Sequence, residues 1–175
     1  MGIRVTGGML RGRIIDSPSG LSVRPTGART REAVFNILQD VSGFSVLDLF
    51  AGSGIMGIEA ISRGASSVVA VENNRKQAIS LRNNYRKLQI ENNLTLWERD
   101  VFSLEFSHEK KTFDLIYADP PFTETYPDLR KFLDFLSPDG VAIFECPSRA
   151  IPEWALEGKV RRYGESSLAF FWKDS

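Results

Sequence analysis

The chain has 175 residues and no formal net charge at pH 7, with 42% hydrophobic and 25% charged residues, which is the composition of one ordinary globular domain. These values exclude a disordered, collagen-like or coiled-coil protein, and no stretch approaches the roughly 18 apolar residues of a membrane span. One cysteine and one histidine leave neither a disulfide framework nor a Cys/His cluster for a metal. The first residues also lack the apolar segment of a secretory signal. We therefore expect a cytoplasmic protein that is a monomer and has no membrane or metal partner.

Basic charge is concentrated at the N-terminus. Residues 1–31 contain six arginines and a single acidic residue, so this part carries +5 and the rest of the chain −5. Such an asymmetry is typical of a segment that meets a polyanion, and the planar guanidinium of arginine suits phosphate. We therefore divide the chain into a basic arm, residues 1–27, and a main domain, residues 28–175. The candidate phosphate ligands are Arg4, Arg11, Arg13, Arg24, Arg29 and Arg31.

The arm is expected to be a β-hairpin followed by a loop. Residues 3–5 and 13–15 read as short strands around a Gly7-Gly8 turn, and residues 16–27 are rich in Ser, Pro and Gly. Apolar residues at helical spacing then predict a helix over residues 28–39.

From residue 45 onward, short apolar runs alternate regularly with amphipathic segments. The apolar runs predict buried strands, and apolar residues three or four apart predict helices. The expected strands are 45–50, 67–71, 94–97, 113–118 and 141–145, and the expected helices are 55–63, 74–90 and 124–136. This alternation indicates right-handed crossovers and a largely parallel sheet.

The C-terminal end departs from that pattern. Residues 159–163 and 168–172 both read as strands, but only four residues separate them. A parallel crossover needs roughly a dozen residues or more, so the last strand must run antiparallel to its predecessor. The predicted fold class is α/β: a Rossmann-like, mostly parallel sheet of seven strands with an antiparallel last strand and an N-terminal hairpin arm.

The strand over 45–50 leads into a glycine-rich turn. Gly52, Gly54 and Gly57 spell G-x-G-x-x-G between a strand and a helix, and Glu72 follows the next strand 20 positions after Gly52. A backbone that turns tightly there can approach a ligand, and the acidic residue can accept hydrogen bonds from two ribose hydroxyls. The motif therefore predicts a nucleoside cofactor, either a dinucleotide or S-adenosylmethionine.

Two features favour S-adenosylmethionine over a dinucleotide. Typical dinucleotide folds end in a parallel strand, whereas this chain is expected to end in an antiparallel one. The other feature is Asp100, just after the expected strand 94–97, which could hold an adenine amino group or could equally cap a turn. S-adenosylmethionine also carries no phosphate but has a cationic methionine part, for which Asp48 offers a carboxylate.

The strand over 113–118 ends in Asp119-Pro120-Pro121-Phe122. The two prolines remove two backbone donors, so the turn presents acceptors, namely the Asp119 carboxylate and the Pro120 carbonyl, beside the ring of Phe122. Such a site suits an amino group on a flat ring. Two acceptors that hold the amine hydrogens can turn the nitrogen lone pair toward an electrophilic methyl group. The motif alone does not distinguish guanine N2, adenine N6 and cytosine N4.

These motifs together resemble the Rossmann-type S-adenosylmethionine-dependent methyltransferases of amino groups, whose signature is Asp, Asn or Ser followed by Pro-Pro and an aromatic residue. More closely, the chain resembles the bacterial 16S rRNA guanine(966)-N2-methyltransferase family. The likeness covers most of the chain, including Arg24-Pro25-Thr26, Arg31-Glu32-Ala33, residues 48–54 and residues 119–122.

The resemblance implies an enzyme that methylates the exocyclic N2 amine of a guanine in small-subunit ribosomal RNA. It implies that the N-terminal arm contacts this RNA, and that Asp119, Pro120 and Phe122 meet the target base. The cofactor contacts that it implies are Asp48, Gly52, Ser53, Gly54, Glu72 and Asp100.

Other functions stay open at this point. An N6-adenine methyltransferase of DNA or RNA would use the same four-residue site, although the DNA enzymes usually add a target-recognition domain. A nicotinamide oxidoreductase would fit the glycine turn, but no Tyr/Lys or His catalytic pair is evident. A ribosome-assembly factor without activity would not need an intact 119–122 motif. Cys146 ends a strand without the base motif of a pyrimidine C5 methyltransferase, so we expect a buried, inert thiol.

Overall fold

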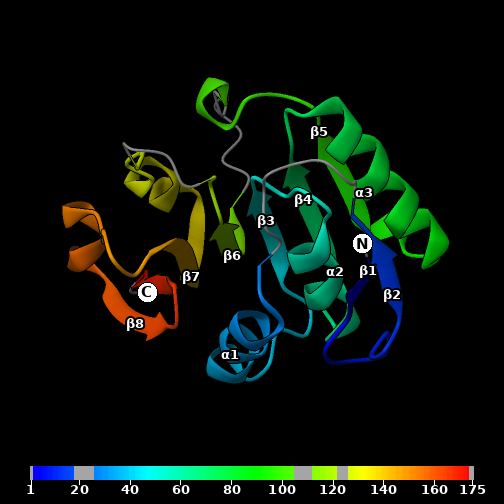
Figure 1. Ribbon diagram of the computed structural model, residues 1–175, viewed down its shortest axis with the longest axis horizontal. Helices are drawn as coiled ribbons and strands as arrows, with labels where there is room; N and C mark the ends of the chain where they lie inside the picture. The colour runs from blue at the N-terminus through cyan, green and yellow to red at the C-terminus, as the bar shows by residue number, and fades with distance from the viewer. Residues whose placement is uncertain (1, 18–25, 105–111, 122–125, 174–175) are drawn as a thin grey trace.

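The computed structural model describes residues 2–17, 26–104, 112–121 and 126–173, and a seven-stranded sheet forms its centre. Figure 1 shows the arrangement of the strands and helices. The strand order is β5-β4-β3-β6-β7-β9-β8. Neighbouring strands from β5 to β7 are parallel, whereas β9 is antiparallel to both β7 and β8. The strands are β3 (Ser45–Leu49), β4 (Ser67–Val71), β5 (Leu94–Trp97), β6 (Phe113–Ala118), β7 (Leu136–Pro147), β8 (Lys159–Tyr163) and β9 (Ser166–Trp172). This topology confirms the predicted Rossmann-like class and its antiparallel last strand.

Each face of the sheet carries its own apolar core. Successive residues of a strand point to opposite faces, so Val46 and Leu47 of β3 belong to different clusters. The face with Val46 is covered by α1 (Ala28–Leu38), α2 (Ile55–Ser62) and α3 (Arg75–Lys87). The face with Leu47 is covered by short 3₁₀ turns, which contribute Phe132 and Trp154. The turns on this face are η2 (Val101–Ser103), η3 (Arg130–Phe135) and η4 (Glu153–Glu157), whereas η1 (Glu91–Asn93) precedes β5 and has no buried residue.

The N-terminal hairpin, β1 (Gly2–Arg4) and β2 (Ile14–Asp16), lies against the helices (Figure 1). Val5 and Ile15 are fully buried and join the core on the helical face. The amide of Leu10 donates to Ser62 Oγ of α2 at 2.9 Å, and the amide of Asp16 donates to Asn84 Oδ1 of α3 at 2.9 Å. Burial and hydrogen bonding on two helices fix the hairpin to the main sheet.

One expected helix is wrong. Of the residues 124–136, the described part forms only the 3₁₀ turn η3, and Leu136 already starts β7. Leu129 and Phe132 are buried and three residues apart, a spacing that matches the three residues per turn of a 3₁₀ helix as well as it matches an α-helix. The predicted stop at 137–140 instead lies inside β7, where the pairing with β6 shifts its register. Within the described residues no helix is both long and apolar enough to cross a membrane.

Candidate active site

The C-terminal ends of β3 and β6 border a pocket of about 440 Å³, including the solvent in its mouth. Leu49, the last residue of β3, pairs with Val71 of β4 and with Ala118 of β6. This register brings the glycine turn, Glu72 and Asp119 to one edge of the sheet, where such folds bind their ligands. The lining residues are Ser17, Thr26, Asp48, Phe50, Ala51, Gly52, Ser53, Ile55, Met56, Gln77, Tyr117 and Asp119.

Glu72 holds the glycine turn in place. Its Oε2 accepts the Gly52 amide and its Oε1 accepts the Asn74 amide, both at 2.8 Å. The carboxylate is nearly buried and does not itself line the pocket. Each oxygen has a second lone pair, so these bonds are compatible with the expected contact to ribose hydroxyls, which stays a prediction.

The glycines of the turn have different physical roles. A Cβ on Gly54 would lie 2.8 Å from Leu81 Cγ, and a Cβ on Gly57 would lie 2.3 Å from the Tyr85 hydroxyl. These two glycines therefore allow α2 to pack closely against α3. A Cβ on Gly52 would meet nothing nearer than 3.6 Å, but its φ of +56° disfavours other residues. Gly52 and Ser53 line the pocket, whereas Gly54 does not.

Asp48 places a buried carboxyl group in the pocket wall. It is 2% exposed, and its Oδ2 accepts a long bond from the Gly57 amide at 3.3 Å. Burial raises the pKa of Asp48 to about 7, and the nearby Glu72 carboxylate adds to the effect. A cation in the pocket would stabilise the ionised form, so this wall fits the positively charged part of S-adenosylmethionine.

The affinity for S-adenosylmethionine should therefore depend on pH. Because the cation favours ionised Asp48, the Kd is expected to rise about tenfold per pH unit as the pH falls below 7. Isothermal titration between pH 5.5 and 8.5 measures this dependence. The Asp48→Asn variant serves as the control and should bind more weakly with an affinity that hardly changes across this range. An equally steep slope in Asp48→Asn would assign the effect to another group.

Asp119 reaches the pocket from the end of β6. Its Oδ2 accepts a hydrogen bond from Thr26 Oγ1 at 2.9 Å. Desolvation raises the pKa of Asp119 above its usual range, and the carboxyl of Glu145 on β7 raises it further. Pro120 follows as a buried residue without a backbone donor, whereas Phe122 lies outside the described residues.

Sequence reasoning missed Thr26, Tyr117 and Glu145 at this site. Glu145 is buried, and its Oε2 accepts a hydrogen bond from the Tyr117 hydroxyl at 2.6 Å. An acidic residue inside an apolar strand was the available signal for Glu145. Its neighbour Cys146 has no exposed surface, and burial raises the pKa of this thiol to about 11, as expected of an inert cysteine.

Comparisons with known proteins agree on one family. The family model described as Conserved hypothetical protein 95 matches residues 3–172. The chain belongs to this family. "Putative rRNA methyltransferase YlbH" of Bacillus subtilis is 34% identical over 125 residues, which are 70% of this chain and 68% of that protein. "Ribosomal RNA small subunit methyltransferase D" of Escherichia coli is 36% identical over 122 residues, which are 69% of this chain and 60% of that protein.

A solved structure extends the likeness over the whole fold. "Putative methyltransferase yhhF" from Escherichia coli superposes with a TM-score of 0.82 at 28% identity and covers 99% of both chains. The sequence matches to the first two relatives are shorter and span 68% and 60% of their lengths. Membership of the Conserved hypothetical protein 95 family therefore includes the N-terminal hairpin as well as the sheet.

Asp100 does not line the pocket. It precedes the 3₁₀ turn η2, and its Oδ1 accepts the Phe102 amide at 2.6 Å. Asp100 is exposed and is absent from the pocket lining. The turn-capping alternative is thus observed, while a contact with adenine stays a prediction.

The six candidate phosphate-binding arginines differ in exposure. Arg4, Arg11, Arg13 and Arg29 are exposed, whereas Arg24 lies outside the described residues. Arg31 is only 2% exposed and forms an ion pair with Glu59 at 3.2 Å. Its guanidinium is enclosed between α1, α2 and the hairpin, so the expectation that Arg31 binds RNA phosphate is corrected.

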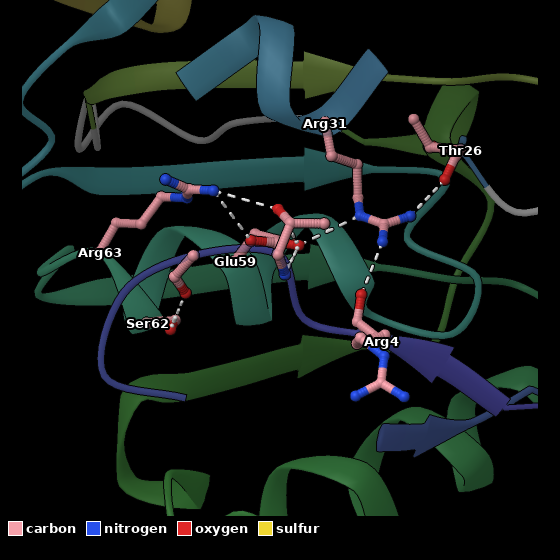
Figure 2. A network of polar contacts seen from close by, with 8 residues as sticks. Arg4, Thr26, Arg31, Glu59, Ser62 and Arg63 are labelled. Atoms are coloured by element: carbon pink, nitrogen blue, oxygen red, sulfur yellow. Dashed lines mark hydrogen bonds and ion pairs between the residues drawn. The ribbon is translucent and has the colours of Figure 1, made fainter. Parts of the chain in front are cut away.

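Arg31 instead joins three segments of the chain (Figure 2). Its Nε donates to Glu59 Oε1 at 3.2 Å, its Nη2 to the Arg4 carbonyl at 2.8 Å and its Nη1 to the Thr26 carbonyl at 2.5 Å. Glu59 Oε1 also accepts the Thr6 amide and hydroxyl at 2.7 and 2.8 Å. The buried charge thereby ties the hairpin and the Thr26 segment to α2.

Proposed function

We propose that the chain transfers a methyl group from S-adenosylmethionine to the exocyclic N2 amine of a guanine in small-subunit ribosomal RNA. The observation that carries the proposal is the pocket that places the acceptor-rich turn at Asp119 beside the buried carboxyl of Asp48. Membership of a family with relatives named as ribosomal RNA methyltransferases supports methylation of ribosomal RNA. The chemistry that S-adenosylmethionine supplies is a methyl group on a positively charged sulfur.

The residues at the pocket would act mainly by positioning the amine. Asp119 and the Pro120 carbonyl would accept its two hydrogens and turn the nitrogen lone pair toward the methyl carbon. Transfer of the methyl group would leave the bonding electron pair on the departing sulfur and would make the amine nitrogen cationic. The Asp119 carboxylate would stabilise that charge until the nitrogen releases a proton to solvent.

The family resemblance favours guanine N2 over the other exocyclic amines. Because the amine must reach Asp119, an unpaired guanine is the favoured target. A paired guanine must be flipped out of its helix, at a cost of a few kcal/mol, before its amine can reach Asp119. Phe122 is the proposed stacking partner of the flipped base. An unpaired loop in the ribosomal RNA makes this step cheapest.

The test uses purified protein, S-adenosylmethionine with a labelled methyl group, and small ribosomal subunits or naked RNA that lack the modification. The RNA is digested to nucleosides, which are separated and counted. Label in N2-methylguanosine is expected. Label in N6-methyladenosine instead would favour the second candidate, an adenine methyltransferase with the same Asp119 site, and would refute the guanine assignment while sparing the cofactor.

We propose that the exposed arginines of the arm, residues 1–27, bind the RNA backbone. Each phosphate contact that is removed should flatten the log–log salt dependence of RNA affinity by about 0.7–0.9. Replacing Arg11 and Arg13 together by Gln is therefore expected to weaken binding and reduce the slope by up to about 1.8. Filter binding between 50 and 300 mM KCl measures the slope.

A matched control separates this surface from a general charge effect. Arg161 and Arg162 are exposed on β8, the strand at the other edge of the sheet from β5. Their double Gln variant removes the same charge and should leave the slope nearly unchanged. If both double variants behave alike, the hairpin is not the RNA surface.

A further inference from the structure

Asp119 receives one hydrogen bond from a segment far away in the sequence. Thr26 Oγ1 donates to Asp119 Oδ2 at 2.9 Å across 93 residues of sequence, and Thr26 is only 7% exposed. Within the described part of the chain, no hydrogen bond reaches the other oxygen, Oδ1. The protein therefore engages one oxygen of the carboxyl group, and Asp119 lines the pocket.

Thr26 is itself held from behind by buried charge (Figure 2). Its carbonyl accepts Arg31 Nη1 at 2.5 Å, and Arg31 is fixed in turn by Glu59 Oε1 at 3.2 Å and the Arg4 carbonyl at 2.8 Å. The side chains of Arg31 and Glu59 are 3% and 0% exposed. The Nε, Nη1 and Nη2 atoms of Arg31 all donate hydrogen bonds. Because the guanidinium is rigid and planar, it fixes the position of the Thr26 carbonyl.

We propose that Thr26 is a positioning residue that sets the orientation of Asp119, so that Oδ1 is presented to the substrate amine. The inference rests on the proposed function for the chemistry of the amine, whereas the contact between Thr26 and Asp119 is observed in the structure. Without the hydroxyl, the carboxyl can rotate about its terminal torsion, which has a broad energy minimum. Oδ1 then meets the amine in only a fraction of molecules.

The Thr26 hydroxyl also favours the charged form of Asp119. The titratable groups that interact with Asp119 are acidic or neutral: Asp48 on β3, Tyr117 on β6, Glu145 on β7 and Tyr126 before η3. Both carboxyls raise the pKa of Asp119, and the Thr26 hydrogen bond lowers it. Removing the hydroxyl is expected to raise the pKa of Asp119, because the carboxylate loses a hydrogen bond that favours its charged form.

Two variants of Thr26 test the proposal. Thr26→Val keeps the shape and removes the hydroxyl, whereas Thr26→Ser keeps the hydroxyl. Thr26→Val is expected to lower kcat by about 10- to 100-fold, somewhat less than the loss of a catalytic donor. It should leave the Kd for S-adenosylmethionine within about twofold of the wild type. The acidic limb of its pH–rate profile should move to higher pH. Thr26→Ser should stay within about threefold of the wild type in kcat. Thr95→Val, on the exposed surface of β5, is the matched control and should change nothing.

A measurement without turnover separates this proposal from the function itself. In protein labelled with ¹³C-aspartate, the Asp119 carboxyl signal is assigned by its loss in Asp119→Asn and titrated by NMR. A higher titration midpoint in Thr26→Val than in the wild type or Thr26→Ser supports the positioning role, even if no amine is methylated. Equal midpoints, or a wild-type kcat and pH profile in Thr26→Val, would overturn it and leave the proposed function intact.

Discussion

Replacement of Asp119 by Ala is expected to lower kcat for RNA methylation by about 10²–10³ while leaving the Kd for S-adenosylmethionine within a few-fold. The carboxyl group is an oriented acceptor at the pocket, fixed on one side by Thr26 Oγ1 at 2.9 Å. Losing one such polar contact at a developing charge costs about 3–4 kcal/mol of transition-state stabilisation. Single-turnover kinetics, combined with isothermal titration of the cofactor, separates the chemical step from binding.

The Asp119→Asn variant distinguishes the two ways in which this residue could act. An amide keeps one acceptor oxygen for the substrate amine, while its NH₂ group can donate to the Thr26 hydroxyl. If Asp119 acts by orienting the amine, the kcat of Asp119→Asn should be well above that of Asp119→Ala. If Asp119 must remove a proton, Asn and Ala should be equally impaired. Wild-type kcat in Asp119→Ala would mean that the residue has only a structural role.

The fold could be predicted because its determinants are local in the sequence. Short apolar runs and helical spacing gave the alternation of strands and helices, and the four residues between β8 and β9 required an antiparallel pair. The glycine turn and Glu72 are separated by one helix and one strand, so the parallel register of β3 and β4 brings them together. Each of these inferences needs only the order of neighbouring elements.

The errors and omissions concern long-range packing and one local spacing that fits two kinds of helix. The net charge of residues 1–31 led us to include Arg31 among six phosphate ligands. A charge count does not show that Arg31 is buried beside Glu59. The bond between Thr26 and Asp119 joins residues 93 positions apart, and no spacing rule connects them. The expected helix near Phe132 was wrong because apolar residues three apart suit a 3₁₀ turn as well.

The burial of Arg31 leads to a second large effect, this time on stability. Arg31→Met removes the partner that lies 3.2 Å from Glu59, whose carboxyl has no exposed surface. Breaking a buried ion pair from one side leaves an uncompensated charge, which costs about 3–5 kcal/mol. The free energy of unfolding in urea is expected to fall by this amount, with the lower end favoured because Arg63 still lies 3.4 Å from Glu59 Oε2.

Two comparisons show whether the buried charge causes the loss. Arg82→Met removes an exposed pair with Glu98, 2.6 Å apart, and should cost at most about 1 kcal/mol because solvent screens both groups. The double variant Arg31→Met with Glu59→Met removes the stranded carboxylate, so it should be more stable than Arg31→Met alone. A double variant less stable than Arg31→Met alone would show instead that Glu59 stabilises the fold through its other contacts, with the Thr6 amide and hydroxyl and with Arg63.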